Sequence, residues 1–351
     1  MHYFFINIIQ LALSIMLINR KNKHIWYILA SFMGAFIVTK LMVPDYQSYK
    51  DTYDLIPSIS FDLIGGDDQQ FNSLYGEKLY LLTGSLFKTF GFNFDGFRFA
   101  IIFFILIVNL KIIEKLSPFL ALSIYIYFVF FFYTDSYIIR QSIAASITSI
   151  AILFVLKGRL YFAFSLILFA SGFHVVSLLA LPLVFFNKFK MSIKVALLML
   201  LLIFCVGYIG VTNLLLPLLN GLNFYATEKL IRYSLSEFGE PLGLLRGSVL
   251  IFTFFSLFYI FSAREIKKHF VNYDYFLNCM LYSFVFLVGF NDFGVFGERT
   301  FRFFPIIFPI VISSCFYAFN KQNKLLVLPF AFILLTILSM LLHNTDRVYF
   351  M

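Results

Sequence analysis

The stretch IIRQSIAASITSIAILFVL, residues 138–156, shows the property that decides the fold. It is apolar or small almost throughout and carries one charged residue, Arg140, close to its start. A helix of about 20 such residues is long enough to cross the roughly 30 Å hydrocarbon core of a bilayer. The stretch is therefore predicted to be a transmembrane helix with an arginine at one end.

Similar runs recur along the whole chain of 351 residues, which is 61% hydrophobic and only 13% charged. A soluble domain of this length cannot bury so much apolar surface. The sequence predicts an all-α, polytopic integral membrane protein that forms a single integral domain, residues 1–351, with about 11–12 transmembrane helices. The predicted spans lie near 3–19, 25–43, 95–113, 117–133, 138–156, 160–171, 174–186, 193–210, 248–262, 274–290, 303–319 and 325–342.

Two of these segments, 160–171 and 174–186, are too short to span a bilayer comfortably. We predict that they form a broken or re-entrant pair near 160–186 that meets at Gly172 and His174. The runs lack the two-residue alternation of membrane β-strands, which argues against a barrel.

The distribution of charge predicts the orientation. Six short connections contain 15 of the 27 basic residues but only 3 of the 18 acidic ones. Short loops rich in Lys and Arg stay in the cytoplasm, so the remaining connections face outward. The net charge of +9 then reflects anchoring at the cytoplasmic face and does not indicate a nucleic-acid partner.

Two long connections, 44–94 and 211–247, are predicted to face outward. Within the first, apolar residues recur at helical spacing over 77–90, which predicts an amphipathic helix on the membrane surface: Leu79, Leu82, Leu86 and Phe90. Long loops in a compact membrane domain usually serve as binding surfaces or lids.

Tyrosines follow the second span with a carboxylate beside them. In a helix, Tyr46, Tyr49 and Tyr53 share one face, where their rings can stack on sugars while Asp45 accepts a hydroxyl proton. The alternative is an aromatic belt at the membrane interface, where tyrosine is enriched in any case.

Arg140 opens its apolar run at the outward end. A guanidinium can hold two phosphate oxygens through parallel hydrogen bonds, which predicts a phosphate clamp. The alternative is an arginine that extends to the lipid head groups. Small residues follow it, as in a packed helix interface: Ser142, Ala144, Ala145 and Ser146.

Three further polar residues adjoin predicted spans at the outward face. Arg299 and Arg302 precede the run 303–319 and can neutralise a diphosphate; the alternative is an internal ion pair with Glu298 or Asp292. His174 lies in the predicted helix break, where a functional imidazole and an ordinary core histidine are both open. The candidate bases for deprotonating a hydroxyl group are Asp45 and His174, with Glu298 third.

Several other classes of site find no support in the sequence. The five histidines lack metal-ligand spacing, so no metal and no other cofactor is expected. Cys205, Cys279 and Cys315 lie within apolar runs, which predicts buried thiols and no disulfide. Phosphate-loop, nucleophile-elbow and Asp-x-Asp motifs are missing, which argues against a cytoplasmic enzyme that uses nucleotide sugars.

Taken in order, these motifs resemble the Wzy-type bacterial polysaccharide polymerases, specifically the EpsG-like branch. The resemblance covers nearly the whole chain and depends on Asp45-Tyr46-x-x-Tyr49-x-x-x-Tyr53, Glu77-x-x-Tyr80, Arg140-Gln141-x-x-Ala144, the Phe173-His174 break that ends in Leu181-Pro182, and Arg299-x-x-Arg302.

The resemblance implies a glycosyltransferase with a GT-C-like fold in the bacterial cytoplasmic membrane, its active site facing the periplasm or exterior. Donor and acceptor would be oligosaccharide repeat units linked to undecaprenyl diphosphate, with membrane lipid, a chain-length regulator and a flippase as further partners. It implies a metal-independent reaction. The residues then divide into three groups: bases Asp45, His174 and Glu298; diphosphate ligands Arg140, Arg299 and Arg302; and glycan ligands Tyr46, Tyr49, Tyr53, Glu77, Tyr80 and Gln141.

Two other functions share some of these features. An O-antigen ligase uses the same donor and also needs outward arginines and a histidine. A flippase or other transporter of lipid-linked oligosaccharides is expected to place its ionisable groups near the midplane, whereas here they gather at one face.

The topology leads to a labelling prediction. Cysteines introduced at Ser73 and Ser236, in a background without the three native cysteines, should react with a membrane-impermeant thiol reagent in spheroplasts, because both long loops face outward. Cysteines introduced at Ser192 and His269, in the basic connections 187–194 and 263–274, serve as controls and should react only after lysis. The opposite pattern would invert the topology.

Overall fold

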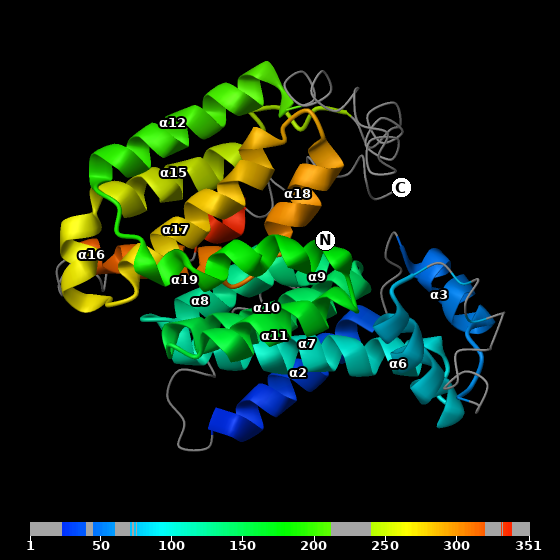
Figure 1. Ribbon diagram of the computed structural model, residues 1–351. Coiled ribbons are helices and arrows are strands. Elements are labelled where there is room, and N and C mark those ends of the chain that lie inside the picture. Colours follow the sequence, from blue (N-terminus) through cyan, green and yellow to red (C-terminus); the bar gives the residue numbers. More distant parts are fainter. Residues whose placement is uncertain are drawn as a thin grey trace. The chain divides into compact units, whose positions relative to one another are not determined.

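The computed structural model of the chain describes residues 23–39, 45–59, 71, 74, 76–211, 240–319, 331 and 333–338. Every regular element in these ranges is a helix (Figure 1). The predicted span 3–19, most of the span 325–342 and most of the loop 211–247 lie outside the described residues. The prediction of an all-α fold is confirmed.

Observed helices coincide with the predicted spans to within a few residues. They are α2 (Lys23–Thr39), α7 (Phe94–Leu116), α8 (Leu120–Tyr127) with the π-helical η1 (Phe128–Phe132) and α9 (Tyr133–Asp135), α10 (Ile139–Leu156), α11 (Leu160–Ser171), η2 (Val175–Val184), α12 (Ile193–Ile209), α15 (Gly247–Phe261), α17 (Tyr273–Phe284) with η5 (Val285–Gly289), and α19 (Ile307–Ser314) with η6 (Cys315–Ala318).

Length separates these helices into two groups. In the described part of the chain, α7 and α10 alone are long and apolar enough to cross a membrane unaided. Two bent pairs raise the number to four if each pair is one span: α15 with α16 (Ala263–His269), bent by 74°, and α18 (Gly294–Arg302) with Ile307–Ala318, bent by 70°. The predicted spans 25–43, 117–133, 160–171, 174–186, 193–210 and 274–290 coincide with apolar helices of 10–17 residues.

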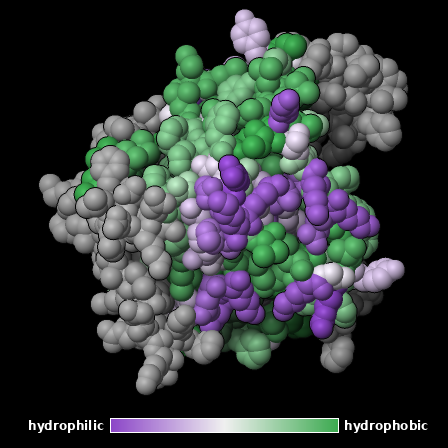
Figure 2. Space-filling model, turned by 90° about the vertical axis from the view of Figure 1, so that its left-hand side faces the viewer, coloured by the Kyte–Doolittle hydropathy of each residue, from purple (hydrophilic) through white to green (hydrophobic). Residues whose placement is uncertain are grey.

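Many large apolar side chains are exposed at the surface. On the face that Figure 2 shows, apolar side chains lie above and between a group of hydrophilic ones. The most exposed are Val271, Tyr161, Tyr208, Leu245 and Phe90. Soluble monomers rarely expose continuous apolar surface on this scale, whereas lipid solvates it. The protein is a polytopic helical membrane protein.

The chain divides into two compact units. Unit 1 comprises residues 1–116, 120–184 and 334–351, and unit 2 comprises 117–119 and 185–333. In unit 1, α10 packs against α7, α11 and η2, and α2 packs against α7 (Figure 1). The small residues of α10, including Ala144, Ala145 and Ser146, are buried, which lets neighbouring helices approach closely.

The predicted break near Gly172 is present and is held by a contact with Leu79. Helix α11 ends at Ser171, η2 starts at Val175, and the two pack against each other. The Leu79 N–H donates to the Gly172 carbonyl over 3.0 Å. A Cβ on Gly172 would lie 2.3 Å from Leu79 Cδ1, so glycine permits this close approach.

The predicted surface helix 77–90 corresponds to α6 (Lys78–Thr89), which follows α3 (Tyr46–Leu55). It buries Tyr80, Leu81, Gly84 and Ser85 against the protein. Leu86 is 44% exposed and Phe90 71% exposed. The side of α6 that packs against the protein is therefore not the predicted apolar row of Leu79, Leu82, Leu86 and Phe90. The exposed members of that row, Leu86 and Phe90, are suited to contact lipid.

In unit 2 the predicted span 303–319 is corrected. Arg299 and Arg302 lie in the separate helix α18, and the apolar helix resumes only at Ile307. Pro305 explains the interruption, because proline lacks an N–H donor and disfavours helical geometry in the preceding residue. The 70° bend then gives the arginines a different direction from α19.

Close backbone contacts hold α18 and α12 against η5. A Cβ on Gly207 of α12 would lie 2.1 Å from the Val288 carbonyl oxygen. On Gly297 of α18, it would lie 2.6 Å from the Phe286 carbonyl oxygen. These contacts place the arginine-bearing helix against the core of unit 2.

Gly207→Ala should therefore destabilise the protein by roughly 1–3 kcal/mol, since a backbone atom has little room to move away from the new methyl group. The control is Gly289→Ala, whose Cβ would meet only Val285 Cγ1, at 3.6 Å. Thermal unfolding in detergent compares the two. Equal midpoints would show that α12 and η5 are not in close contact.

Candidate functional site

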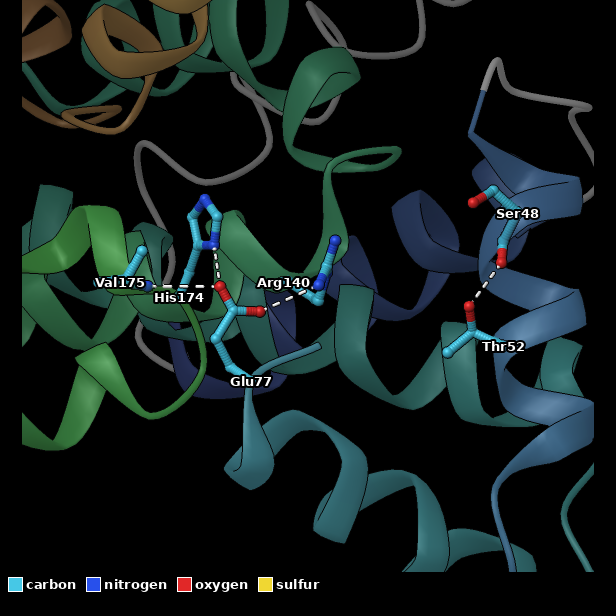
Figure 3. A network of polar contacts seen from close by, with 6 residues as sticks. All are labelled: Ser48, Thr52, Glu77, Arg140, His174 and Val175. Carbon is cyan, nitrogen blue, oxygen red and sulfur yellow. Dashed lines mark hydrogen bonds and ion pairs between the residues drawn. The ribbon is translucent and has the colours of Figure 1, made fainter. Parts of the chain in front are cut away.

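Glu77 joins three distant parts of unit 1. One carboxylate oxygen, Oε2, accepts a hydrogen bond from Arg140 Nη1 over 3.0 Å. The other, Oε1, lies 2.6 Å from His174 Nδ1 and accepts a longer bond of 3.4 Å from the Val175 N–H (Figure 3). The network thus connects the start of α6, the first turn of α10 and the break before η2.

Local backbone geometry positions each member. Glu77 directly precedes the first turn of α6. The residue before it, Gly76, has φ +146°, and a Cβ there would lie 3.3 Å from Arg140 Nη1. The Gly172–Leu79 contact fixes α6 beside the break that carries His174. Gly76 and Gly172 thus allow the backbone approaches that bring Glu77 close to Arg140 and His174.

The site is partly buried but reachable, since the side chains of Glu77, Arg140 and His174 are 19%, 22% and 22% exposed. Burial by itself raises the pKa of Glu77. The hydrogen bond and charge of His174 and the charge of Arg140 outweigh it and lower this pKa to about 2. Glu77 is therefore an anion at neutral pH.

The charge of Glu77 decides the tautomer of His174. An ionised carboxylate only accepts hydrogen bonds, so Nδ1 carries the proton that faces Oε1. The second ring nitrogen, Nε2, points away from Glu77 (Figure 3). A carboxylate that orients an imidazole in this way prepares the distal nitrogen to accept a proton from a hydroxyl group.

Two tyrosine rings also contact the guanidinium of Arg140. Its Cζ lies 5.6 Å from the ring centre of Tyr49 and 5.9 Å from that of Tyr80. The two rings meet edge to face, with 6.1 Å between their centres. Arg140 is thus fixed by a carboxylate and two aromatic rings, which a mere lipid anchor does not require.

The predicted glycan ligands differ in accessibility. Tyr46 and Tyr49 are partly exposed, and the Tyr46 hydroxyl donates to Asp95. In contrast, Tyr53 is 2% exposed, stacks on Phe97 and donates to the Phe92 carbonyl over 2.8 Å. Buried side chains cannot contact a sugar in this structure, and this applies to Tyr53, Tyr80 and Gln141. Of these, Tyr80 supports the site from within the protein, beside Arg140 and Tyr49.

Glu77 occupies the centre of the ion-pair network, and its predicted role as a glycan ligand stays a prediction. Asp45, a predicted base, precedes α3, and its carbonyl oxygen accepts from the Tyr49 N–H at the start of that helix. The structure therefore brings His174 together with Glu77 and Arg140. No sequence spacing connects these three residues, so the network was not predicted.

A second charged cluster lies in unit 2. Glu298 Oε1 accepts from Arg302 Nη2 over 2.6 Å and from Arg302 Nε over 3.2 Å. Arg246 Nη1 lies 3.5 Å from Glu298 Oε2. The internal ion pair that the sequence left open for Arg302 is present. Two guanidinium partners make Glu298 a weaker proton acceptor than an unpaired carboxylate, so it is a poor candidate base.

Arg246 was missed by the sequence analysis, although the signal was there. It directly precedes the apolar helix α15, as Arg140 opens the run of α10. Arg299 on α18 also interacts with the charge of Glu298, so three arginines gather around this glutamate. Such a group of guanidinium groups is suited to an anionic ligand.

Among the residues that the structure describes, no group of three or more His, Cys, Asp or Glu side chains is arranged to hold a metal ion. A reaction without metal stays a prediction.

The low pKa of Glu77 has a consequence for stability. A carboxylate whose pKa is lowered on folding stabilises the protein above pH 4.5, and the effect is lost as pH falls towards 2. The stability difference between the native protein and Glu77→Gln should therefore be largest near neutral pH and shrink on acidification.

Thermal unfolding of both proteins at about pH 7 and about pH 3.5 measures this difference. Glu265→Gln is the control, because the ion pair of Glu265 with Lys268 is 45% and 51% exposed and should contribute little at either pH. A Glu77→Gln effect that does not change with pH would contradict the ion-pair network.

Comparison with known proteins adds one finding. Residues 23–350 match the EpsG family, which agrees with the resemblance expected from the motifs. No curated protein and no solved structure matches the chain. With the apolar helices, the match indicates a membrane protein of polysaccharide biosynthesis and a polymerase of the glycosyltransferase type. Because the match covers nearly the whole sequence, the chain belongs to the EpsG family.

Proposed function

We propose that this protein joins oligosaccharide repeat units carried on undecaprenyl diphosphate into a longer glycan at the outer face of the bacterial cytoplasmic membrane. The growing glycan is transferred from its lipid diphosphate to the non-reducing end of an incoming lipid-linked unit. The observation that carries the proposal is the orientation of His174 by Glu77, 2.6 Å away, beside the arginine Arg140.

His174 is the proposed general base. The acceptor hydroxyl gives its proton to Nε2 while its oxygen attacks the anomeric carbon of the donor sugar. The bond between that carbon and the diphosphate oxygen breaks, and its electron pair leaves with the lipid diphosphate. Glu77 stabilises the imidazolium that forms, since it is an anion next to the opposite ring nitrogen.

Arg140 is the proposed partner of the leaving group. Negative charge develops on the diphosphate as its bond to the sugar breaks, and a positioned guanidinium stabilises that charge. A guanidinium carries five N–H donors, so the bond from Nη1 to Glu77 is compatible with phosphate contacts elsewhere on the group. Tyr49, partly exposed beside this guanidinium, is a proposed contact for the sugar.

The cluster of unit 2 is proposed to bind diphosphate as well. Arg246, Arg299 and Arg302 gather around Glu298, and α18, which carries Arg299 and Arg302, is bent away from the apolar helix that follows. Two lipid-linked substrates each bring a diphosphate, so a polymerase needs more than one cationic site. A chain-length regulator and a flippase stay predicted partners.

The test is a reaction with purified protein in lipid nanodiscs. The protein receives lipid-diphosphate-linked repeat units without nucleotide sugar, ATP or added divalent metal, and gel electrophoresis follows the glycan length. Longer lipid-linked glycans are expected, with or without EDTA. Lengthening that requires added metal would overturn the metal-independent mechanism. Movement of the lipid across the bilayer without lengthening would identify a flippase, and transfer only to lipid A core a ligase.

Two substitutions locate the chemistry in unit 1. His174→Gln should lower the polymerisation rate by roughly 10²–10⁴-fold, because glutamine cannot take up the proton. Arg140→Lys should lower it strongly as well, since lysine keeps the charge but loses the planar fork. The controls are His269→Gln and Arg264→Lys, both at exposed positions of α16. Normal glycan from either site variant at equal protein level would remove that residue from the mechanism.

A further inference from the structure

The buried carboxylate of Asp135 lies outside the site and has no role in the proposed reaction. Asp135 is 2% exposed and ends α9, after which the chain turns through residues 136–138 into α10. Burying a charged group in a membrane protein costs several kcal/mol unless partners satisfy it, so such a residue usually has a function. An apolar residue would serve packing better at this position.

Hydroxyl groups on both sides satisfy Asp135. Tyr127 Oη donates to its Oδ2 over 2.8 Å, and Asn109 Nδ2 donates to the same tyrosine oxygen over 3.0 Å. Ser142 Oγ lies 3.3 Å from Oδ1 and 3.2 Å from the Ile138 carbonyl, so its single proton is shared between the two. These hydrogen bonds connect α7, α8, the end of α9 and the start of α10. All four side chains are buried: Asn109, Tyr127, Asp135 and Ser142.

This series of hydrogen bonds ends at the helical turn that carries Arg140. Ser142 lies in the first turn of α10, two residues beyond Arg140, and its own N–H donates to the Ile138 carbonyl. A negative charge near the N-terminus of a helix also interacts favourably with the helix dipole. Asp135 therefore holds the start of α10 from the side of the bundle core.

The connection between α8 and α9 is itself unusual. Residues Phe128–Phe132 form a π-helical turn, which inserts an extra residue and changes the direction of all that follows. Without that turn, Asp135 would face a different side of its helix. The π-helical turn thus directs the carboxylate of Asp135 towards α10, which indicates that the position of this carboxylate matters.

We infer that Asp135 is a positioning residue, which anchors the first turn of α10 through Ser142 and so places the guanidinium of Arg140 against Glu77. The importance of this placement for turnover rests on the proposed function. The placement itself does not, and can be measured separately.

Cross-linking measures the placement. In protein without the three native cysteines, cysteines are introduced in place of Glu77 and Arg140, or of Glu77 and His174, and joined with a short bifunctional thiol reagent. Asp135→Asn should lower the yield of the 77–140 cross-link several-fold and leave the 77–174 yield unchanged, because only position 140 is on α10. Loss of both cross-links, or of neither, would overturn the inference.

Activity gives the second measurement. Ser142→Ala should lower the polymerisation rate about tenfold, and Asp135→Asn up to about 100-fold, since small misplacements of a reacting group cost this much. The matched control is Ser149→Ala on the same helix, where the buried hydroxyl donates to the Ala145 carbonyl, over 2.9 Å.

Combined variants show whether Asp135 acts through Arg140. Added to Arg140→Lys, Asp135→Asn should cause little further loss, because the group that it positions is already changed. Losses that multiply would overturn the inference. If the unmodified protein does not lengthen glycans at all, the proposed function is wrong, and the cross-linking result still decides the role of Asp135.

Discussion

The ion pair between Glu77 and Arg140 is the interaction on which the site depends. It is formed by a carboxylate at the start of a short surface helix and a guanidinium at the start of a buried one. Because the same carboxylate also contacts His174, one side chain determines both the direction of the arginine and the tautomer of the histidine. Loss of Glu77 would leave two cationic or basic groups without their common partner in a partly buried place.

The surrounding fold is arranged so that this carboxylate reaches its partners. Gly172 allows the backbone to approach Leu79 at a distance where a side chain would collide, and Gly76 adopts a φ of +146° that side chains rarely adopt, beside Arg140. The break between α11 and η2 brings His174 to the end of its segment, where an imidazole can leave the apolar interior. Tyr80 lies buried beside Arg140, and both Tyr80 and the buried Tyr53 pack against Phe97. The site therefore combines a rigid back wall with partly exposed polar groups.

The two charged clusters differ in character. In unit 1, one glutamate is shared by an arginine and a histidine, which is an arrangement suited to proton transfer. In unit 2, one glutamate is shared by two arginines with a third on the same helix as one of them, which is suited to binding an anion. This contrast supports a division of labour between chemistry and substrate binding in the proposed polymerase.

The sequence by itself determined the class of fold and the positions of most helices. Apolar runs such as residues 138–156 must become helices in lipid, because no water is present to satisfy an unpaired backbone. It also marked Arg140, His174 and Arg302, since a charged or polar residue beside an apolar run is costly and therefore conspicuous.

Only the tertiary structure decided which of these residues act together. Glu77, Arg140 and His174 are far apart in the chain, and no periodicity connects a helix start, a helix turn and a helix break. The burial of Tyr53 and Tyr80 was equally hidden, because one helical face looks the same in sequence whether it meets protein, lipid or ligand. Helical spacing specifies neighbours within one helix, whereas the site is made of contacts between helices, which depend on how the whole unit packs.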